Sequence, residues 1–255
     1  MSDYLLMGQL SELERLRLQS EVWEPAGRRL LEQLGPGDGR RAIDLACGPM
    51  GWLRILHEAG WETTGTDVQP MMLEAAARLD VPVHLVEDDI FASKLSPAQF
   101  DLVHARFLLA PLGRWDEQLA SYVRLLSPGG VLVLEDPDAG SWHFNPPAPA
   151  SDRLISHILD AFVAAGGEFD AGRALPSLLR NFGIEPTLSA EVVALGPGHP
   201  YLALPLEFAA SLRPRLIQTL GETALDSLLA ETAGELADPQ RWGLSFTLVQ
   251  AWARL

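Results

Sequence analysis

Two hydrophobic periods alternate along the first 136 residues of the chain. Short apolar runs, typical of strands buried on both faces, alternate with stretches whose apolar residues recur at helical spacing. Strands are predicted over residues 42–46, 62–66, 81–86, 100–105 and 131–135, and helices over residues 51–60, 70–79 and 116–126. Because parallel strands are joined by right-handed helical crossovers, this alternation predicts a doubly wound α/β sheet.

The regular alternation of strand and helix patterns is absent at both ends of the chain. Residues 5–34 predict a helix with a break near Pro25, and a Gly- and Pro-rich turn follows. After residue 136 the pattern predicts a helix that ends at Gly166-Gly167 and a helical stretch interrupted by Pro205 and Pro214. Two late strands are predicted over residues 187–195 and 245–253. We divide the chain into an N-terminal helical lid at residues 1–36 and a main domain at residues 37–255. Within the main domain, residues 137–186 and 197–242 are expected to form a cap.

Composition narrows the class of protein. A chain of 255 residues, of which 47% are hydrophobic, suits one large α/β domain or a domain with a cap. The net charge of −15 makes nucleic acid and anionic membrane surfaces poor partners, because both attract concentrated Lys and Arg. Cys47 is the single cysteine, so we expect neither an intramolecular disulfide nor a metal site. Without a signal peptide or an apolar span in its sequence, the protein is expected to be cytoplasmic.

A glycine-rich turn between the first strand and its helix is the first candidate ligand site. Residues 44–51 read DLACGPMG, and we call residues 46–51 the Gly turn. Backbone amides and the helix N-terminus at such a turn favour an anionic or zwitterionic group. The dinucleotide pattern G-x-G-x-x-G is absent, since Ala46 stands where its first glycine would be. By itself the segment is equally consistent with an ordinary βα connection.

Two acidic positions follow at similar intervals. Asp67 ends the second strand, where an acid in such folds bonds ribose hydroxyls. Its alternative role is a helix cap, because Pro70 begins the next helix. Asp88-Asp89 follows the third strand, where an acid can accept a hydrogen bond from the adenine amine. A solvated acidic loop is the alternative there.

Residues 40–136 resemble the class I S-adenosylmethionine-dependent methyltransferases. The resemblance rests on five segments in order, at residues 43–48, 65–70, 88–90, 100–106 and 126–133. It implies a Rossmann-like sheet of seven strands whose last strand is antiparallel, in agreement with the two late strands. It also implies S-adenosylmethionine as cofactor and S-adenosylhomocysteine as product. By position, the residues implied to contact the cofactor are Asp44, Ala46, Gly48, Gly51, Asp67, Val68, Met72, Asp89, Ile90, His104 and Ala105.

The sequence departs from the family pattern at two places. Ala46 and Met50 replace frequent glycines, which suggests a narrower pocket. Ala110-Pro111 stands where many small-molecule members have a Glu-His pair, which puts a general base from that loop in doubt. Candidate catalytic or substrate-contacting residues lie elsewhere, at His143, at Glu135 with Asp136, at Arg106 as a carboxylate partner, and at His199 with Tyr201.

These features favour methyl transfer from S-adenosylmethionine to a small organic molecule, with O-methylation ahead of N- or C-methylation. The N-terminal helix would be a lid or a homodimer contact. Two alternatives stay open: a cyclase or pericyclase that keeps the methyl group on its cofactor, and a non-catalytic cofactor-binding or regulatory protein. A nicotinamide oxidoreductase is disfavoured because the dinucleotide pattern is missing.

Overall fold

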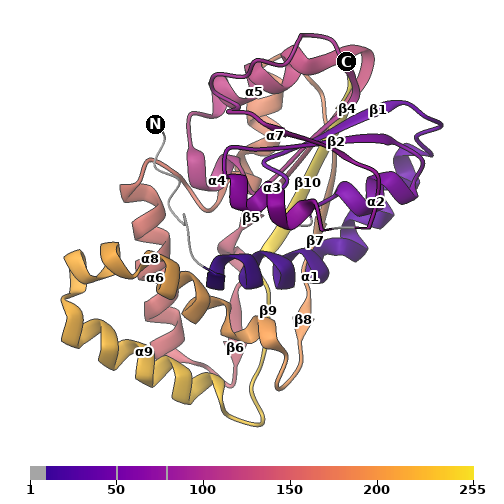
Figure 1. Ribbon diagram of the computed structural model, residues 1–255. Coiled ribbons are helices and arrows are strands. Elements are labelled where there is room, and N and C mark those ends of the chain that lie inside the picture. The colour runs from indigo at the N-terminus through magenta and orange to yellow at the C-terminus, as the bar shows by residue number, and fades with distance from the viewer. Residues whose placement is uncertain (1–9, 50, 79) are drawn as a thin grey trace.

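The computed structural model describes residues 10–255 apart from residues 50 and 79, and its centre is one twisted sheet of seven strands (Figure 1). The strand order is β3-β2-β1-β4-β5-β10-β7. β1 to β5 are parallel, and β10 runs antiparallel to both β5 and β7. The expected doubly wound sheet with an antiparallel last strand is therefore confirmed. The strands are β1 (Arg41–Leu45), β2 (Glu62–Asp67), β3 (His84–Glu87), β4 (Phe100–Arg106), β5 (Leu126–Asp138), β7 (Thr187–Glu191) and β10 (Thr247–Arg254).

Helices cover both faces of this sheet because successive strand residues point to opposite sides. On one face, Val103 of β4 packs in a core with α4 (Leu109–Leu112), α5 (Trp115–Leu125) and α7 (Ala171–Asn181). On the other face, the adjacent Leu102 packs with α1 (Leu10–Leu34) and α2 (Leu53–Glu58). The short α3 (Pro70–Ala76) packs beside β2 and β3.

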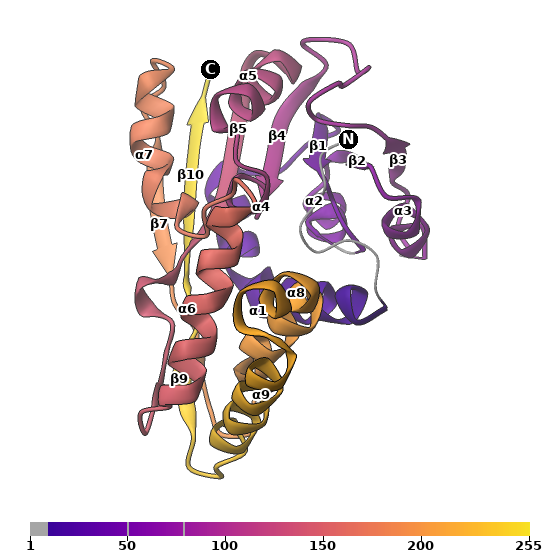
Figure 2. The same cartoon turned by 90° about the vertical axis from the view of Figure 1, so that its left-hand side faces the viewer.

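A helical cap lies beyond the carboxyl ends of the parallel strands (Figure 2). It contains α6 (Pro149–Ala164), α8 (Leu204–Leu220) and α9 (Glu222–Leu236), which pack on one another. A second sheet of three strands, in the order β6-β9-β8, lies to the right of these helices in Figure 1. Its strands are β6 (His143–Asn145), β8 (Ala194–Leu195) and β9 (Trp242–Leu244). The aromatic core of the cap also contains Trp23 of α1, so α1 joins the cap to the sheet.

Several local predictions were wrong, each for a tertiary reason. The strand expected over residues 187–195 divides into β7 and β8, which belong to different sheets, because Val193 pairs with Ser245 through the Val193 amide and the Ser245 hydroxyl at 2.9 Å. Pro25 does not interrupt α1: it lies on the exposed side, where water can satisfy the freed carbonyl. Within the segment over residues 201–237, Pro205 lies in the first turn of α8, directly after a 3₁₀ helix, as an interruption there predicts. Pro214 does not interrupt α8, which continues to Leu220 and is followed by Gly221.

The segment over residues 137–186, predicted as cap, is divided between two places. α6 packs against α8 and α9, whereas α7 packs on β5 and β10 of the large sheet. α7 was not predicted as a helix. Residues 5–9 of the predicted N-terminal helix lie outside the described residues. No helix of the described chain is both long enough and apolar enough to cross a membrane.

Candidate functional site

A cavity of about 400 Å³ opens at the carboxyl ends of the parallel strands. One half is lined by the Gly turn and by the ends of β2 and β3, the other by phenylalanines from separate segments, two of which are the cap helices α6 and α8. Four residues of α1 form part of the wall: Arg15, Leu16, Gln19 and Ser20. Ligands of open α/β sheets bind at this edge, so the cavity is the candidate functional site.

The Gly turn has a backbone conformation that requires its small residues. Ala46 and Gly48 have φ values of 46° and 60°, in the left-handed region. Gly48 has open space where a Cβ would be, whereas a Cβ on Gly51 would lie 2.5 Å from Asp44 Oδ2. The same Asp44 oxygen accepts a hydrogen bond from the Trp52 amide at 2.9 Å. Asp44 therefore fixes the end of the turn and the start of α2.

Asp67 connects the Gly turn to the end of β2. Its two carboxylate oxygens accept hydrogen bonds from the Gly48 amide at 3.2 Å and the Gln69 amide at 2.9 Å. Burial raises the pKa of Asp67, and these backbone amides oppose the rise. Asp67 lines the cavity and is 6% exposed. The N-cap residue of α3 is Gln69, so Asp67 bonds the amide just before the helix and does not cap the helix itself.

After β3, the structure brings two acids to the cavity rather than one. Asp89 lines it while its side chain accepts from the Phe91 amide at 2.9 Å. Asp88, which the sequence analysis did not select, is buried and also lines the cavity. One Asp88 oxygen accepts from the Lys94 amide at 2.9 Å, and the other has no partner among the described residues. Nothing in the residue pattern separates Asp88 from Asp89, because only the direction of the loop turns Asp88 inward.

Nine of the eleven residues expected to contact a cofactor line the cavity; His104 and Ala105 do not. His104 is fully buried and forms contacts of 2.7 Å from Nδ1 to Asp44 and 3.1 Å from Nε2 to Glu135. Glu135, a candidate catalytic residue, is also fully buried and does not line the cavity. The side chains of His104 and Glu135 lie within the sheet, beneath the residues that form the cavity wall.

Asp136, the neighbour of Glu135, is a buried helix cap. Its Oδ1 accepts a hydrogen bond from the Ala110 amide at 3.0 Å, at the start of α4. Burial raises the pKa of Asp136 to about 8, although the Ala110 and Leu109 amides favour its ionised form. This carboxyl group is not among the residues that line the cavity.

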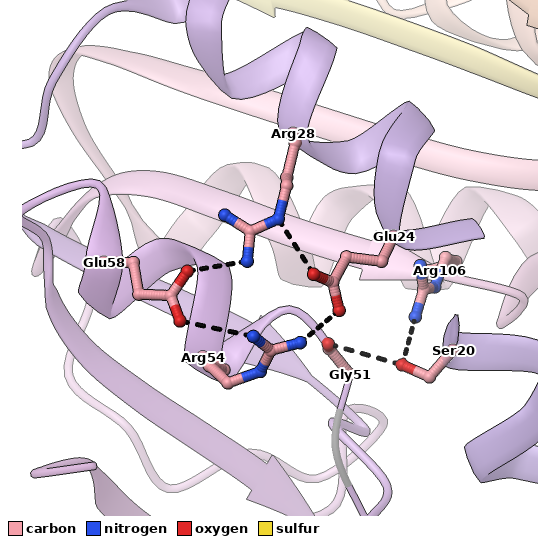
Figure 3. A network of polar contacts seen from close by, with 7 residues as sticks. All are labelled: Ser20, Glu24, Arg28, Gly51, Arg54, Glu58 and Arg106. Carbon is pink, nitrogen blue, oxygen red and sulfur yellow. Dashed lines mark hydrogen bonds and ion pairs between the residues drawn. The ribbon is translucent and has the colours of Figure 1, made fainter. Parts of the chain in front are cut away.

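Arg106 lines the cavity and contacts α1. Its Nη2 donates to Ser20 Oγ at 3.2 Å, and the Ser20 hydroxyl donates to the Gly51 carbonyl at 3.5 Å (Figure 3). Further along α1, a ring of ion pairs ties that helix to α2. In this ring, Glu24 and Glu58 alternate with Arg28 and Arg54 (Figure 3). α1 is therefore attached to the Gly turn through Ser20 and to α2 through the ion-pair ring.

The other half of the cavity has an aromatic wall. Five phenylalanines from separate segments of the chain form a connected series of ring contacts, with the centroids of contacting rings 5.4–6.0 Å apart. They are Phe107, Phe162, Phe169, Phe208 and Phe246. Arg15 also lies here, over the Phe208 ring at 4.8 Å, and it pairs with Glu12 at 2.6 Å. Residues this far apart in sequence give no local signal of a shared wall.

The remaining candidates lie away from the cavity. His143 is exposed on β6 of the small sheet, where the register pairs it with Leu244. Tyr201 is buried and accepts a hydrogen bond from Trp23 Nε1 at 3.2 Å, and His199 caps the short 3₁₀ helix that contains Tyr201. None of the three lines the cavity. Met50, predicted to narrow the pocket, lies outside the described residues.

The sheet order and the Gly-turn cavity define a methyltransferase-type domain, and comparison with known proteins supports this class. Residues 16–188 match the family model described as "Methyltransferase domain". Because this match covers more than half of the chain, the protein belongs to the methyltransferase-domain family, whose members use S-adenosylmethionine.

Curated relatives match over part of their length. Malonyl-[acyl-carrier protein] O-methyltransferase of Enterobacter lignolyticus is 33% identical over 159 residues, which are 59% of this chain and 63% of that protein. Trans-aconitate 2-methyltransferase of Delftia acidovorans is 32% identical over 128 residues, 48% of this chain and 47% of that protein. The chain thus spans about half to somewhat under two thirds of these relatives.

The fold also has solved counterparts. A putative methyltransferase from Bacillus halodurans superimposes with a TM-score of 0.57 at 12% identity, covering 90% of this chain and 98% of that one. At this identity the similarity concerns the fold.

Proposed function

We propose that the protein binds S-adenosylmethionine in the acid-lined half of the cavity and methylates a small organic molecule held in the aromatic half. The observation that supports this most strongly is the continuity of one cavity from the Gly turn to the phenylalanine wall. A methyl donor and an acceptor held in these two halves would meet without crossing bulk solvent. This arrangement favours transfer because proximity of the two reacting groups lowers the barrier.

The residues of the first half fit this cofactor. Asp67 would accept hydrogen bonds from the ribose hydroxyls, and Val68 and Met72 offer apolar surface for adenine. The unpartnered buried oxygen of Asp88 supplies an acceptor suited to an exocyclic amine, beside Asp89. The Gly turn leaves open space for the amino-acid part. When bound, S-adenosylmethionine supplies an activated methyl group, so the protein's task is orientation.

The second half suits an acceptor with an apolar body and an anionic end. The four carboxylates that line the cavity come from the Gly-turn side, whereas its two arginines, Arg15 and Arg106, lie on the acceptor side. Among the described lining residues there is no His, Lys or Tyr to remove a proton. An acceptor that is already ionised, such as a carboxylate, needs no general base. O-methylation of a carboxylate oxygen is therefore the favoured reaction, and two relatives are named for methylating carboxyl-bearing compounds.

The helices around the cavity are proposed to control access to it. α1 supplies four wall residues and would act as the lid, while α6 and α8 of the cap each supply one phenylalanine of the wall. The acceptor would then be selected mainly by these segments.

A two-stage experiment tests the proposal. Calorimetry with S-adenosylmethionine should first give saturable binding. Incubation of the loaded protein with a panel of apolar carboxylic acids and their matched primary amides and alcohols should then yield S-adenosylhomocysteine and methyl ester, detected by mass spectrometry. Methylation of the alcohols or amides alone would overturn the carboxylate assignment. Conversion of a substrate without S-adenosylhomocysteine would indicate the cyclase alternative, and binding without turnover would indicate a cofactor sensor.

A further inference from the structure

We propose that His104 is a positioning residue for cofactor binding, in which a doubly protonated imidazole ring holds Asp44 against the Gly turn. The inference rests on the proposed function, because it takes the Gly turn to be part of the S-adenosylmethionine site. His104 itself lies under the cavity wall and acts through Asp44.

A row of polar side chains crosses four neighbouring strands beneath the cavity. It runs from Asp44 on β1 through His104 on β4 and Glu135 on β5 to Gln250 on β10. Asp44 is the register partner of His104, and Glu135 is the register partner of Gln250. Each of the four residues is at most 2% exposed. Buried polar groups of this kind are expensive unless every one is paired, so the row constrains the strand ends.

Protons on both ring nitrogens would satisfy both of the contacts that the ring makes. Nδ1 lies 2.7 Å from an Asp44 oxygen and Nε2 lies 3.1 Å from a Glu135 oxygen. Ionised carboxylates only accept hydrogen bonds, and a neutral imidazole has a single N–H. A neutral ring would therefore leave one carboxylate facing a nitrogen lone pair. The imidazolium satisfies both.

The charges around the ring support the same state. Asp44 and Glu135 contribute two negative charges, and Arg106 Nε lies 3.9 Å from Glu135. Asp136 adjoins Glu135 in β5, and the Trp52 ring of α2 stacks on His104 at 3.8 Å. Burial by itself would lower the pKa of His104, but the charge and hydrogen bond of Asp44, followed by those of Glu135, raise it above its ordinary value.

Asp44 transmits this arrangement to the Gly turn. While Oδ1 is held by His104, Oδ2 accepts the Trp52 amide and packs against Gly51. When His104 loses its proton, one carboxylate loses its partner and the two buried negative charges repel each other with less compensation. Asp44 then holds the Trp52 amide at the start of α2 less firmly. Cofactor affinity is therefore highest while His104 is protonated, and it falls as pH rises through the pKa of His104.

The test is calorimetric affinity for S-adenosylmethionine from about pH 6 to about pH 9.5. Wild type is compared with His104→Gln, Glu135→Gln and a control, His84→Gln, which alters an exposed histidine of β3. The amine of the cofactor titrates identically against every variant, so ratios of affinity isolate the protein. Wild type should bind roughly tenfold more tightly than His104→Gln at about pH 6, and this advantage should shrink at high pH. His84→Gln should follow wild type.

Glu135→Gln gives a response that a purely structural role would not. Replacing one carboxylate by a neutral amide removes a charge that favours the imidazolium, so the pH midpoint of the affinity change should move to lower pH. Histidine ¹⁵N NMR of the wild type should find both ring nitrogens of His104 protonated at neutral pH, which needs no variant to fold. A neutral ring, or an unmoved midpoint in folded Glu135→Gln, would overturn the inference. Absence of binding at every pH would instead refute the proposed function.

Discussion

Replacement of Asp67 by alanine is expected to weaken S-adenosylmethionine binding by at least roughly tenfold, because Asp67 is the buried acid that joins the Gly turn to β2. The alanine would lack the proposed acceptor for the ribose hydroxyls. It would also free the Gly48 amide, which Asp67 holds at 3.2 Å.

The magnitude follows from the kind of hydrogen bond lost. A hydrogen bond to a charged group contributes about 1.5–3 kcal/mol, which corresponds to a roughly 10- to 150-fold change in affinity. Asp67→Asn retains a carbonyl oxygen and nearly the same volume, but its amide nitrogen cannot accept the Gly48 or Gln69 amide. Its loss should therefore be smaller, near the lower end of that range.

Titration calorimetry measures both variants, with unfolding midpoints as the check on folding. Asp80→Ala is the matched control, since it removes one nearby negative charge from an exposed residue that does not line the cavity. It should bind within about twofold of wild type. If folded Asp67→Ala bound as tightly as the control, Asp67 would not hold the ribose.

Three further expectations follow from the geometry. Asp136 has a raised pKa of about 8, so folding takes up a proton between about pH 4 and that value. The free energy of unfolding of the wild type should thus fall with rising pH, by up to about 1.4 kcal/mol per pH unit relative to Asp136→Asn. If urea unfolding gave the same difference between the two proteins at pH 5 and pH 8, this expectation would be contradicted. Gly51→Ala should impair cofactor binding far more than Gly48→Ala, because only its Cβ meets Asp44; equal calorimetric affinities would refute the steric argument. Glu24→Gln should cost less than about 1 kcal/mol in urea unfolding, since its partners are partly exposed; a much larger loss would mean the ion-pair ring stabilises α1 cooperatively.

The Gly turn and Asp67 could be found in the sequence because their signals are local. A left-handed turn needs small residues next to one another, and the acid at the end of the next strand follows from the parallel topology. The same reasoning placed His104 and Glu135 in the correct strands, near their carboxyl ends, but could not determine how deeply their side chains are buried. Whether a strand-end side chain faces a ligand or its neighbouring strand depends on register, and here His104 pairs with Asp44 across β1 and β4.

The sequence by itself determined the alternation of strands and helices and the turn with its acids, because hydrophobic period and glycine spacing act over short distances. The antiparallel direction of the last strand was implied only by the family resemblance. Only the tertiary structure determined which residues form the phenylalanine wall and that the side chain of Asp88 is turned into the cavity. It also placed His143 in a separate small sheet, away from the cavity. The wall brings together five phenylalanines spread over residues 107–246, and such contacts arise from packing between distant segments. The residues around Phe107 or Phe246 in the sequence do not predict which aromatic ring each of them contacts.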